Sequence, residues 1–594
     1  MARRKHTRRG FLKALGLSAA AVTGGRLVAQ CGAAEPKPAR PNVILVITDD
    51  QGYGDLRCHG NEVIQTPNLD RMHGQSARLT NFHVGPTCAP TRAGLMTGRY
   101  CNRTGVWHTI MGRSMLRKDE RTLADVLKAG GYRTGHFGKW HLGDNYPFNP
   151  RYRGFDVVWR HGGGGVGQTP DYWGNDYVDD TYEHNGTFVK HTGYCTDIWF
   201  RGAMKFIAAS AKARKPFFCY LTTNAPHGPY IVPEKYSAMY KGKANVPNAN
   251  FYGMITNIDE NMGRLMKQLD ELGIAEETLL IFMTDNGTAA GFRGGKGFNA
   301  GMRGTKGSEY DGGHRVPCFL RWPGGGIRPG RDIQRITAHV DLLPTLAELC
   351  GAPKPKGVAL DGKSLAPLLT GSGEDWPDRV LVTDSQRIEN PAKWRKSAVM
   401  TDRWRLVNGK ELYDMPADPG QRNNVADANP KVVQRLRGEY DKWWESVSAR
   451  FGEYCETILG SSKEFLVCLT AHDWHGPGAN ATWNQGHIRR GPRANGFWAV
   501  DVASAGTYQF ELRRWPREAN KPIRERFFPV VKARLKIADV DTIQPVAADA
   551  QAVTFRVKLP AGRTTLQTWF LGADPADKKQ TCGAFYVYAM CKGS

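Results

Sequence analysis

Residues 42–50 read Asn-Val-Ile-Leu-Val-Ile-Thr-Asp-Asp, so that a continuous apolar run leads into two carboxylates. Residues 278–287, Thr-Leu-Leu-Ile-Phe-Met-Thr-Asp-Asn-Gly, repeat this pattern, and the apolar run at residues 217–221 leads on to Asn224 and His227. Strands covered on both faces have near-continuous apolar sequence instead of alternation. We therefore expect these segments to be central strands of a mainly parallel sheet.

Segments with helical periodicity separate these runs. One such segment carries four apolar residues on one helical face, followed by Gly273 as a stop signal: Met262, Leu265, Leu269 and Leu272. Alternating strands and helices predict an α/β fold with helices flanking the sheet. Ligands of such folds bind at the carboxyl ends of the strands. The oxygen-bearing side chains at those ends are Asp49, Asp50, Asp285 and Asn286.

Hard cations such as Ca²⁺ and Mg²⁺ prefer oxygen ligands of this kind. Two separate pairs, each ending an apolar strand, predict one metal site built from both strand ends. We expect Ca²⁺, with Mg²⁺ as the alternative that the sequence leaves open.

The pattern changes after about residue 375. Asn408-Gly409 between two short apolar segments predicts a two-residue hairpin turn, and Asn429-Pro430 begins an amphipathic helix. From about residue 455, apolar and polar residues alternate, as at residues 508–512, which favours antiparallel strands. We expect a catalytic domain at 41–375, a smaller C-terminal α+β subdomain at 376–454 and an additional mostly β domain at 455–594.

The N-terminus has the features of an export signal. Thr7-Arg8-Arg9-Gly10-Phe11-Leu12-Lys13 resembles a twin-arginine signal, and we expect residues 1–34 to be removed after transport by the twin-arginine translocase. The mature protein would be periplasmic or extracellular, and a lipid anchor at Cys31 is an open alternative. We expect no membrane span, because the rest of the chain has no apolar segment of sufficient length.

Charge and cysteine content narrow the partners. The net charge is +24, and +17 remains without residues 1–30, so the mature chain attracts anions. Sulfated polysaccharide and nucleic acid are both polyanions that a basic protein would attract. The sequence contains no nucleic-acid-binding motif, which favours the polysaccharide. Apart from Cys31 and Cys88 there are ten cysteines without metal-type spacing. Cys582 and Cys591 could bridge across a hairpin, but scattered thiols fit equally well.

Cys88 begins the segment Cys-Ala-Pro-Thr-Arg-Ala-Gly-Leu-Met-Thr-Gly-Arg, with Arg92 four residues later. We expect a helix from Thr91 to Thr97, whose N-terminus would stabilise negative charge near Cys88. The Cys-x-Pro-x-Arg pattern resembles the signature of the type I sulfatases. In that family the cysteine is converted to formylglycine, and the aldehyde hydrate attacks sulfur.

Further segments extend the resemblance over residues 41 to about 426. Phe-Gly-Lys-Trp-His-Leu-Gly at 137–143 supplies Lys139 and His141, Ala-Pro-His-Gly-Pro at 225–229 supplies His227, and Gly-Thr-Lys-Gly at 304–307 supplies Lys306. The resemblance implies the alkaline phosphatase-like fold and a metal site that includes residue 88. It also implies maturation by a formylglycine-generating enzyme or an anaerobic sulfatase-maturing enzyme.

The resemblance implies a role for each candidate catalytic residue. Arg92 would brace the hydrated aldehyde, Lys139 and Lys306 would bind sulfate, and His227 would protonate the departing alcohol. His141 would act as the base that expels sulfate from residue 88 and restores the aldehyde. His314 stands where the family has an apolar residue, so the role of this position is in doubt.

We expect the substrate to be a sulfated carbohydrate. Candidate contacts are Arg160 and His161 in a glycine-rich segment, His314, and Trp483 in the C-terminal part. Two alternatives remain: a phosphodiesterase or phosphonate monoester hydrolase of the same superfamily, and a non-catalytic protein that binds sulfated glycans.

Overall fold

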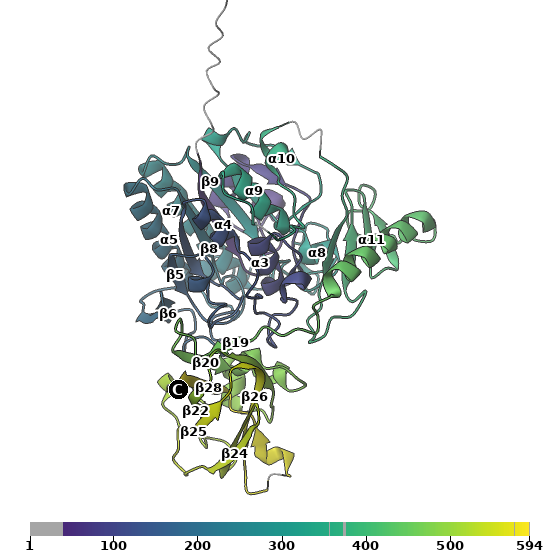
Figure 1. The fold of residues 1–594 in the computed structure, drawn as a ribbon. Coiled ribbons are helices and arrows are strands. Elements are labelled where there is room, and N and C mark those ends of the chain that lie inside the picture. Colours follow the sequence, from purple (N-terminus) through teal and green to yellow (C-terminus); the bar gives the residue numbers. More distant parts are fainter. Residues whose placement is uncertain (1–39, 356, 372–375, 575, 593–594) are drawn as a thin grey trace, which may run out of the picture. The chain divides into compact units, whose positions relative to one another are not determined.

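The computed structural model describes residues 40–355, 357–371, 376–574 and 576–592 (Figure 1). The expected export segment at 1–34, including Cys31, lies outside the described residues. No helix within the described ranges is long and apolar enough to cross a membrane. Residues 40–594 form one compact unit.

A ten-stranded sheet forms the centre of the N-terminal part. In spatial order its strands are β13 (Asp332–Ile333), β2 (Ala77–Leu79), β12 (Cys318–Arg321), β9 (Thr278–Thr284), β1 (Asn42–Thr48), β8 (Phe217–Thr222), β4 (Arg133–Gly138), β5 (Val157–Arg160), β6 (Thr181–His184) and β7 (Thr187–Lys190). The central strands β9, β1, β8, β4 and β5 run parallel, whereas β12 and β6 join them antiparallel. The predicted mainly parallel sheet is confirmed.

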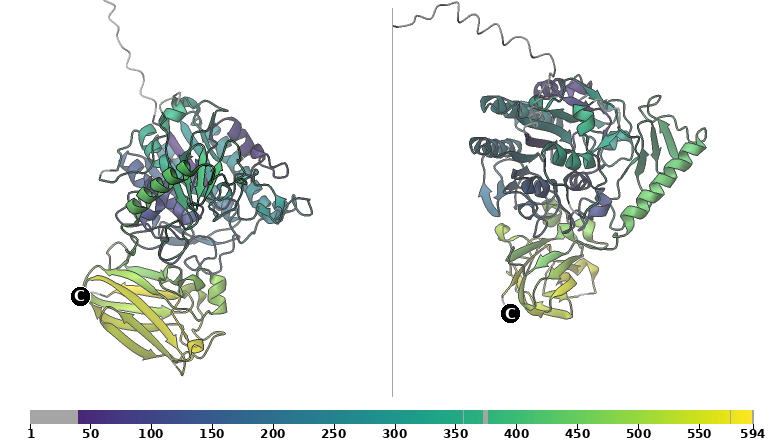
Figure 2. Two further views of the ribbon diagram at one scale, coloured as in Figure 1. Left: turned by 90° about the vertical axis from the view of Figure 1, so that its right-hand side faces the viewer. Right: turned by 45° about the horizontal axis from the view of Figure 1, so that its top comes forward.

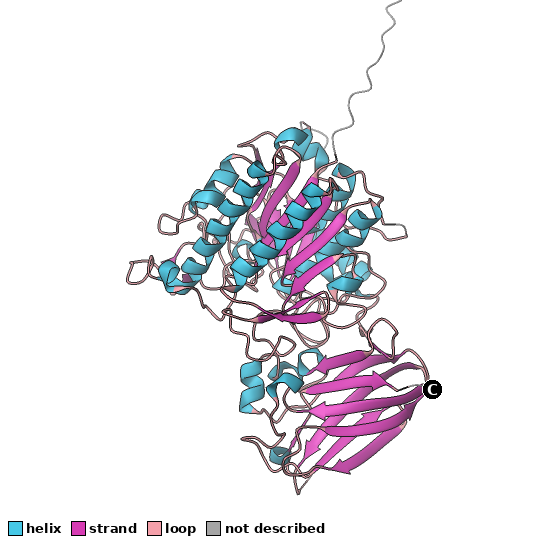
Figure 3. Ribbon diagram, turned by 90° about the vertical axis from the view of Figure 1, so that its left-hand side faces the viewer, coloured by secondary structure: helices cyan, strands magenta, loops and turns pink. Residues whose placement is uncertain are grey.

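Helices cover both faces of this sheet, as Figure 3 shows. Val43, Leu45 and Ile47 of β1 pack in one core with α3 (Cys88–Thr97), α4 (Leu123–Ala129) and α9 (Leu342–Leu349). Ile44 and Val46 point to the opposite core, with α2 (Pro67–Gly74), α5 (Cys195–Lys212) and α7 (Ala249–Glu271). Both faces of β1 are therefore buried, which explains its unbroken apolar sequence.

Two helix boundaries differ from expectation. Helix α7 ends at Glu271, so Leu272 lies at its C-cap and is 37% exposed, while Met262, Leu265 and Leu269 are buried. Helix α3 begins at Cys88 and not at Thr91. Pro90 fits inside the first turn because the first N–H groups of a helix have no intrahelical partner.

Short elements connect the main ones. They are α6 (Glu234–Ser237), α8 (Asp311–His314), α10 (Ala366–Thr370), and the small strand pairs β3 (Phe82–His83) with β14 (Thr337–Ala338) and β10 (Phe292–Arg293) with β11 (Lys296–Gly297).

A separate antiparallel sheet follows, formed by β15 (Leu381–Asp384), β16 (Ser397–Met400), β17 (Trp404–Val407) and β18 (Glu411–Asp414). Helix α11 (Pro430–Ser448) packs on it through Leu436 and Tyr440 (Figure 2). The turn at Asn408-Gly409 contains three residues instead of two, because Val407 pairs with Glu411.

The C-terminal part is a two-sheet β unit around one core. One sheet contains β19 (Thr457–Leu459), β21 (Phe497–Val502), β26 (Gly562–Leu571), β23 (Lys532–Ile537), β24 (Val540–Pro545) and β27 (Thr581–Cys582). The other contains β20 (Leu466–Thr470), β28 (Tyr586–Cys591), β22 (Gly506–Arg513) and β25 (Val553–Leu559), and α12 (Gln485–Arg490) lies between strands β20 and β21 in the chain. The eleven described cysteines are free, so no bridge joins Cys582 to Cys591.

Candidate active site

Strands β1 and β9 bring the predicted oxygen ligands together. The two strands pair in register up to Thr48 and Thr284, and carboxylate oxygens of Asp49, Asp50 and Asp285 lie within 4.8 Å of one another. All three residues are buried. The backbone N–H of Asp50 donates to Asp285 Oδ1 at 3.1 Å, which fixes one strand end against the other.

Two oxygen atoms in this cluster suit a cation. Asp49 Oδ1 and Asn286 Oδ1 are buried and have no hydrogen-bond partner among the described residues, whereas Asn286 Nδ2 donates to Asp50 Oδ1 at 3.0 Å. Leaving a buried carboxylate oxygen unpaired is costly unless a positive charge faces it. The donor set therefore fits a hard divalent ion with oxygen coordination.

Each carboxylate is also paired with its own cation. Arg92 Nη2 lies 2.7 Å from Asp285 Oδ2, Lys139 Nζ lies 2.5 Å from Asp49 Oδ2, and Lys306 Nζ lies 2.6 Å from Asp50 Oδ1. Arg92 Nη1 also donates to the carbonyl of Lys139, which ties α3 to the segment after β4. Three predicted cations thus surround the strand ends.

These charges act on the carboxyl groups in opposite directions. Burial raises the pKa of Asp50, but Lys306 and then His227 outweigh it and hold the pKa well below its usual value. At Asp285, burial and the adjacent Asp49 raise the pKa to about 6 despite Arg92. Additional positive charge at the cluster would therefore favour the ionised form of Asp285.

Cys88 is the first residue of α3 and is 3% exposed. Burial raises the pKa of its thiol, with Lys139 and Lys306 opposing and Asp49 and Asp285 reinforcing the effect. The charges of these four residues therefore act on the thiol. The unmodified side chain is protonated at neutral pH and is a weak nucleophile, although the adjacent helix N-terminus and lysines suit an anion.

His141 follows β4 with a left-handed backbone, φ 62°. Its Nε2 lies 2.8 Å from the carbonyl of Thr109 and therefore carries the proton, so Nδ1 is an acceptor. Nδ1 is buried and has no partner within the described structure. Burial and then Lys139 hold the pKa of His141 well below its usual value, so the ring is a neutral base.

His227 follows β8 and approaches the same cluster. Its Nδ1 donates to the carbonyl of Gly228 at 2.6 Å, and its Nε2 lies 3.8 Å from Asp50 Oδ2. Burial and then Lys306 lower its pKa to about 4. Nε2 is therefore the atom of His227 that faces the charged centre.

The glycine-rich segment at residues 162–165 packs against both histidines. A Cβ at Gly164 would lie 2.2 Å from His141 Cε1, whereas one at Gly165 would keep 3.6 Å from His227 Nδ1. Asp171 holds this segment, because its carboxylate accepts from the backbone N–H groups of Gly162 and Gly167. The role of this segment as a packing surface for the histidines was not predicted.

The proposed substrate contacts occupy different environments. Arg160 is buried between Asp144 and Glu183, with Nη2 2.6 Å from Glu183 Oε2. His314 is also buried, with Nδ1 3.0 Å from His83 Nδ1 and Nε2 3.1 Å from the carbonyl of Glu309. Both side chains are thus bound to other parts of the protein, which leaves them little capacity to bind a ligand.

The other two proposed substrate contacts are His161 and Trp483, and their surroundings differ from those of the first two. His161 is buried with Nδ1 2.9 Å from the Gly162 carbonyl, and its Nε2 has no partner in the described part of the chain. Trp483 is half-buried and accepts from the backbone N–H of Thr169 through its carbonyl. That bond attaches the β unit to the segment that follows the glycines.

Sequence reasoning missed two further neighbours of His141. The carbonyl of Thr109 selects its protonation, and His472 of the β unit has its ring centroid 6.3 Å away. A backbone carbonyl has no sequence signature, and a contact over more than 300 residues leaves no local pattern.

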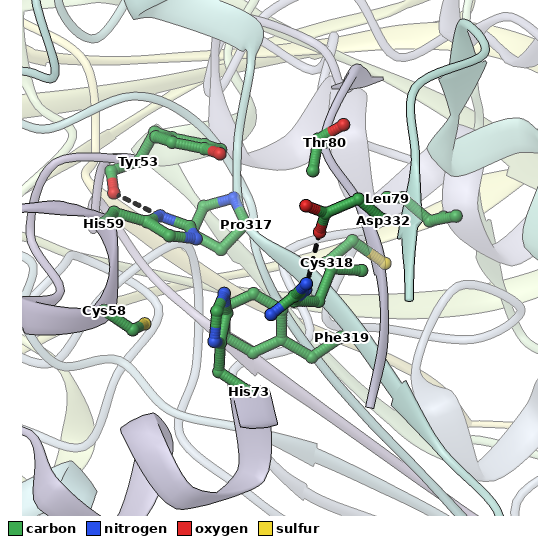
Figure 4. A pocket seen from close by; sticks show the side chains of 11 residues that line it. Tyr53, Cys58, His59, His73, Leu79, Thr80, Pro317, Cys318, Phe319 and Asp332 are labelled. Atoms are coloured by element: carbon green, nitrogen blue, oxygen red, sulfur yellow. Dashed lines mark hydrogen bonds and ion pairs between the residues drawn. The ribbon is translucent and has the colours of Figure 1, made fainter. Parts of the chain in front are cut away.

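A second cluster of metal-type side chains lies in a separate cavity of about 290 Å³ (Figure 4). It contains Cys58, His59 and His73, with Arg78 paired to Asp332 at 2.6 Å. Burial and then Arg78 lower the pKa of His73. One thiol and two imidazoles do not offer the oxygen ligands that a hard cation prefers, so this cluster is less suited to Ca²⁺ than the carboxylates at the strand ends.

Comparison with known proteins gives consistent matches. The family model described as Sulfatase matches residues 41–352, and the one described as N-sulphoglucosamine sulphohydrolase, C-terminal, matches residues 305–443. Neither match reaches the β unit.

The alignments to individual relatives extend over most of the length of each relative. The chain is 32% identical to arylsulfatase A of Homo sapiens, covering 69% of this chain and 89% of that protein. It is 29% identical to N-acetylgalactosamine-6-O-sulfatase of Bacteroides thetaiotaomicron, covering 67% and 92%. The crystal structure of Ps i-CgsB in complex with k-i-k-neocarrahexaose superposes with a TM-score of 0.62 at 29% identity, covering 70% of this chain and 95% of that one.

Proposed function

The chain belongs to the sulfatase family, and from that premise we propose that it removes sulfate from a sulfated carbohydrate through formylglycine at residue 88 and Ca²⁺ at the strand ends. The observation that carries the proposal is the position of Cys88 at the start of α3, a helix whose Arg92 is bonded to Asp285 and to the Lys139 carbonyl. Relatives named for N-acetylgalactosamine 6-sulfate hydrolysis support a carbohydrate substrate.

Asp49, Asp50, Asp285 and Asn286 would hold the metal, since their oxygens converge and two of these oxygens lack partners. When present, the aldehyde hydrate supplies a nucleophilic hydroxyl, and the ion supplies a Lewis acid that favours its ionised form.

The chain's own residues bind and orient the sulfate. Lys139 and Lys306 place two positive charges at the carboxylates of Asp49 and Asp50, and the N-terminus of α3 adds backbone N–H donors at residue 88. Arg92 positions Asp285 and the Lys139 backbone through three hydrogen bonds. Charge that develops on sulfate oxygens is thus stabilised by preorganised groups.

Two histidines would move protons at identified atoms. His227 Nε2 would protonate the leaving sugar oxygen, and a bound sulfate beside Lys306 raises the proton affinity of that atom. His141 Nδ1 would accept the proton needed to release sulfate, because Nε2 is committed to Thr109. Because each proton transfer uses its own histidine, the release of sulfate would not depend on a change in the protonation of His227.

Sulfate release tests the proposal. The full-length protein should release sulfate from an aryl sulfate and a sulfated amino sugar, and mass spectrometry should show an aldehyde at residue 88. Cys88→Ser should lose nearly all turnover, while Cys591→Ser, at the end of β28, should retain it. Full turnover in protein that carries only the Cys88 thiol would refute the role of formylglycine.

A second arm separates the alternatives. If aryl phosphate diesters were hydrolysed with much higher kcat/KM than aryl sulfates, the phosphodiesterase interpretation would replace this one. Binding of sulfated glycan without any sulfate release would favour the non-catalytic alternative.

A further inference from the structure

A cavity of about 350 Å³ lies beside the sulfate site. Its lining includes seven polar side chains: His108, Lys306, Ser385, Arg387, Arg395, Lys396 and Asn480. No Asp or Glu is among the residues that line it. The volume lies within the range of about 300–1,000 Å³ that small-molecule sites occupy.

Four Lys and Arg side chains line this cavity, and one of them, Lys306, is paired with Asp50. The other three, Arg387, Arg395 and Lys396, form no ion pair within the described ranges. Arg395 makes one side-chain contact, from Nε to the carbonyl of Gln386 at 2.7 Å, so the rest of its guanidinium is available. Arg387 and Lys396 are exposed and Arg395 is half-buried, so all three cations are accessible to an anion that enters the cavity.

Neighbouring residues on the same connection behave differently. Lys393 is paired with Asp441 at 2.7 Å, and Glu389 accepts from the backbone N–H of Gly476. The one acid in this part of the connection is therefore directed at the β unit. On this connection, the cations that line the cavity lack a carboxylate partner, whereas Lys393, outside the cavity, has one.

A buried polar atom also points to a ligand. Ser385 is 2% exposed, and its Oγ has no hydrogen-bond partner in the described structure although the residue lines the cavity. A buried hydroxyl without a partner costs free energy unless something binds it. An oxyanion in the cavity could accept from this hydroxyl.

The connection between β15 and β16 is preorganised. The backbone N–H of Ser385 donates to the Lys396 carbonyl, and the buried side chain of Gln386 bonds to Asp384 and Ala392. Arg387 and Lys396 have left-handed backbones, with φ 42° and 40°. Such conformations cost energy in non-glycine residues and persist where the surroundings enforce them.

Lys306 connects this cavity to the reaction centre. Its Nζ lies 2.6 Å from Asp50 Oδ1, and the same side chain lines the cavity. A carbohydrate whose sulfate ester lies at residue 88 would therefore extend into the basic cavity. Asn480 of the β unit also lines it, so two separate parts of the chain contribute.

We propose that this cavity is a second anion subsite, in which Arg387, Arg395, Lys396 and Ser385 bind another sulfate or a carboxylate of the same carbohydrate. This inference rests on the proposed sulfatase function, because Lys306 is shared between the two sites. It makes the enzyme selective for polyanionic over singly charged substrates.

The test compares Arg387→Gln/Lys396→Gln with wild type on matched sugars. Probes are N-acetylglucosamine 6-sulfate against glucosamine 2-N,6-O-disulfate, and N-acetylgalactosamine 6-sulfate alone against the same sugar linked to a glucuronate. Each probe is also measured as a competitor of aryl sulfate hydrolysis, so that a sugar that is bound but not cleaved still reports affinity. Wild type should prefer at least one doubly charged probe by roughly tenfold or more, and the double variant should lose that preference.

The arms separate the anion sources and the two proposals. Preference for the disulfated sugar assigns a sulfate, and preference for the uronate assigns a carboxylate. Lys393→Gln, on the same connection but paired with Asp441, should retain the wild-type preference. A preference that survives in the double variant, or is absent in wild type, would overturn the subsite. Failure of wild type to release sulfate from any ester would instead overturn the proposed function.

Discussion

At the scale of single residues, the site is a set of balanced charges with strain at two positions. Asp50 and His141 have left-handed backbones, φ 70° and 62°, which cost of order 1–3 kcal/mol each in non-glycine residues. The strain is held by the bonds of Asp50 to Asp285, Asn286 and Lys306. The local backbone directs both side chains into the charged centre.

A metal at the strand ends would stabilise the folded protein. We expect Ca²⁺ to raise the midpoint temperature of thermal unfolding and chelation to lower it. At a Ca²⁺ concentration one hundred times the Kd, the free energy of unfolding should increase by about 2.7 kcal/mol. Asp285→Asn should remove most of this increment, because it removes one charged ligand from a site of three carboxylates.

Asp285→Asn also leaves Arg92 buried without its partner, which by itself lowers stability by about 3–5 kcal/mol. Asp341→Asn is the matched control, since Asp341 is equally buried and lies 2.9 Å from Arg379. It should lose stability but retain the increment from Ca²⁺. An undiminished increment in Asp285→Asn would exclude Asp285 from the metal site.

The sequence predicted which residues end the central strands, because apolar runs that stop at carboxylates are a local pattern. It could not predict which charged side chains the protein itself neutralises. Arg160 is paired with Asp144 and Glu183, which are 16 and 23 residues away, and His314 meets His83 across more than 200 residues. Availability for a ligand depends on such remote partners.

At the scale of elements, the connections decide the geometry more than the strands do. Strands were predictable because burial on both faces gives continuous apolar sequence. Helix α3 begins three residues before the expected Thr91, because the first turn of a helix accommodates Pro90. The glycine run at 162–165 packs against buried His141 and half-buried His227, a role that its sequence does not indicate.

Adjacent glycines in that run allow a paired test. Gly164→Ala would place a Cβ 2.2 Å from His141 Cε1, so we expect the ring to shift and kcat to fall at least tenfold. Gly165→Ala introduces no contact closer than 3.4 Å and should alter kcat little. Steady-state kinetics on an aryl sulfate gives the comparison, with thermal unfolding to confirm that both variants fold. Equal kcat values in the two variants would show that the segment does not position His141.

At the scale of the whole molecule, the β unit takes part in the site and is not a detached appendage. The backbone N–H of Met111 donates to the His472 carbonyl, and Tyr586 donates its hydroxyl proton to the Thr169 carbonyl. Asn480 reaches the basic cavity. Alternating sequence predicted the strands of this unit, but its contacts with residues 109–112 and 169 follow from docking that no local pattern encodes.

Glu464 makes one of these contacts sensitive to pH. Its Oε2 accepts from the backbone N–H of Tyr146 at 2.8 Å, and burial raises its pKa from 4.5 to about 7. Because the pKa of Glu464 is higher in the folded than in the unfolded protein, the folded state binds this proton more tightly. The resulting stabilisation is complete below about pH 4.5 and is lost as the pH rises through about 7. The loss amounts to at most about 3 kcal/mol.

We therefore expect the midpoint of thermal unfolding to fall between pH 5 and pH 8 more steeply in wild type than in Glu464→Gln, which cannot ionise. Glu439→Gln, on the exposed side of α11 and paired with Lys442 at 3.0 Å, should keep the wild-type slope. Differential scanning calorimetry over this range measures the difference directly. If Glu464→Gln showed the wild-type slope, ionisation at this contact between the β unit and the segment after His141 would not contribute to the pH dependence of stability.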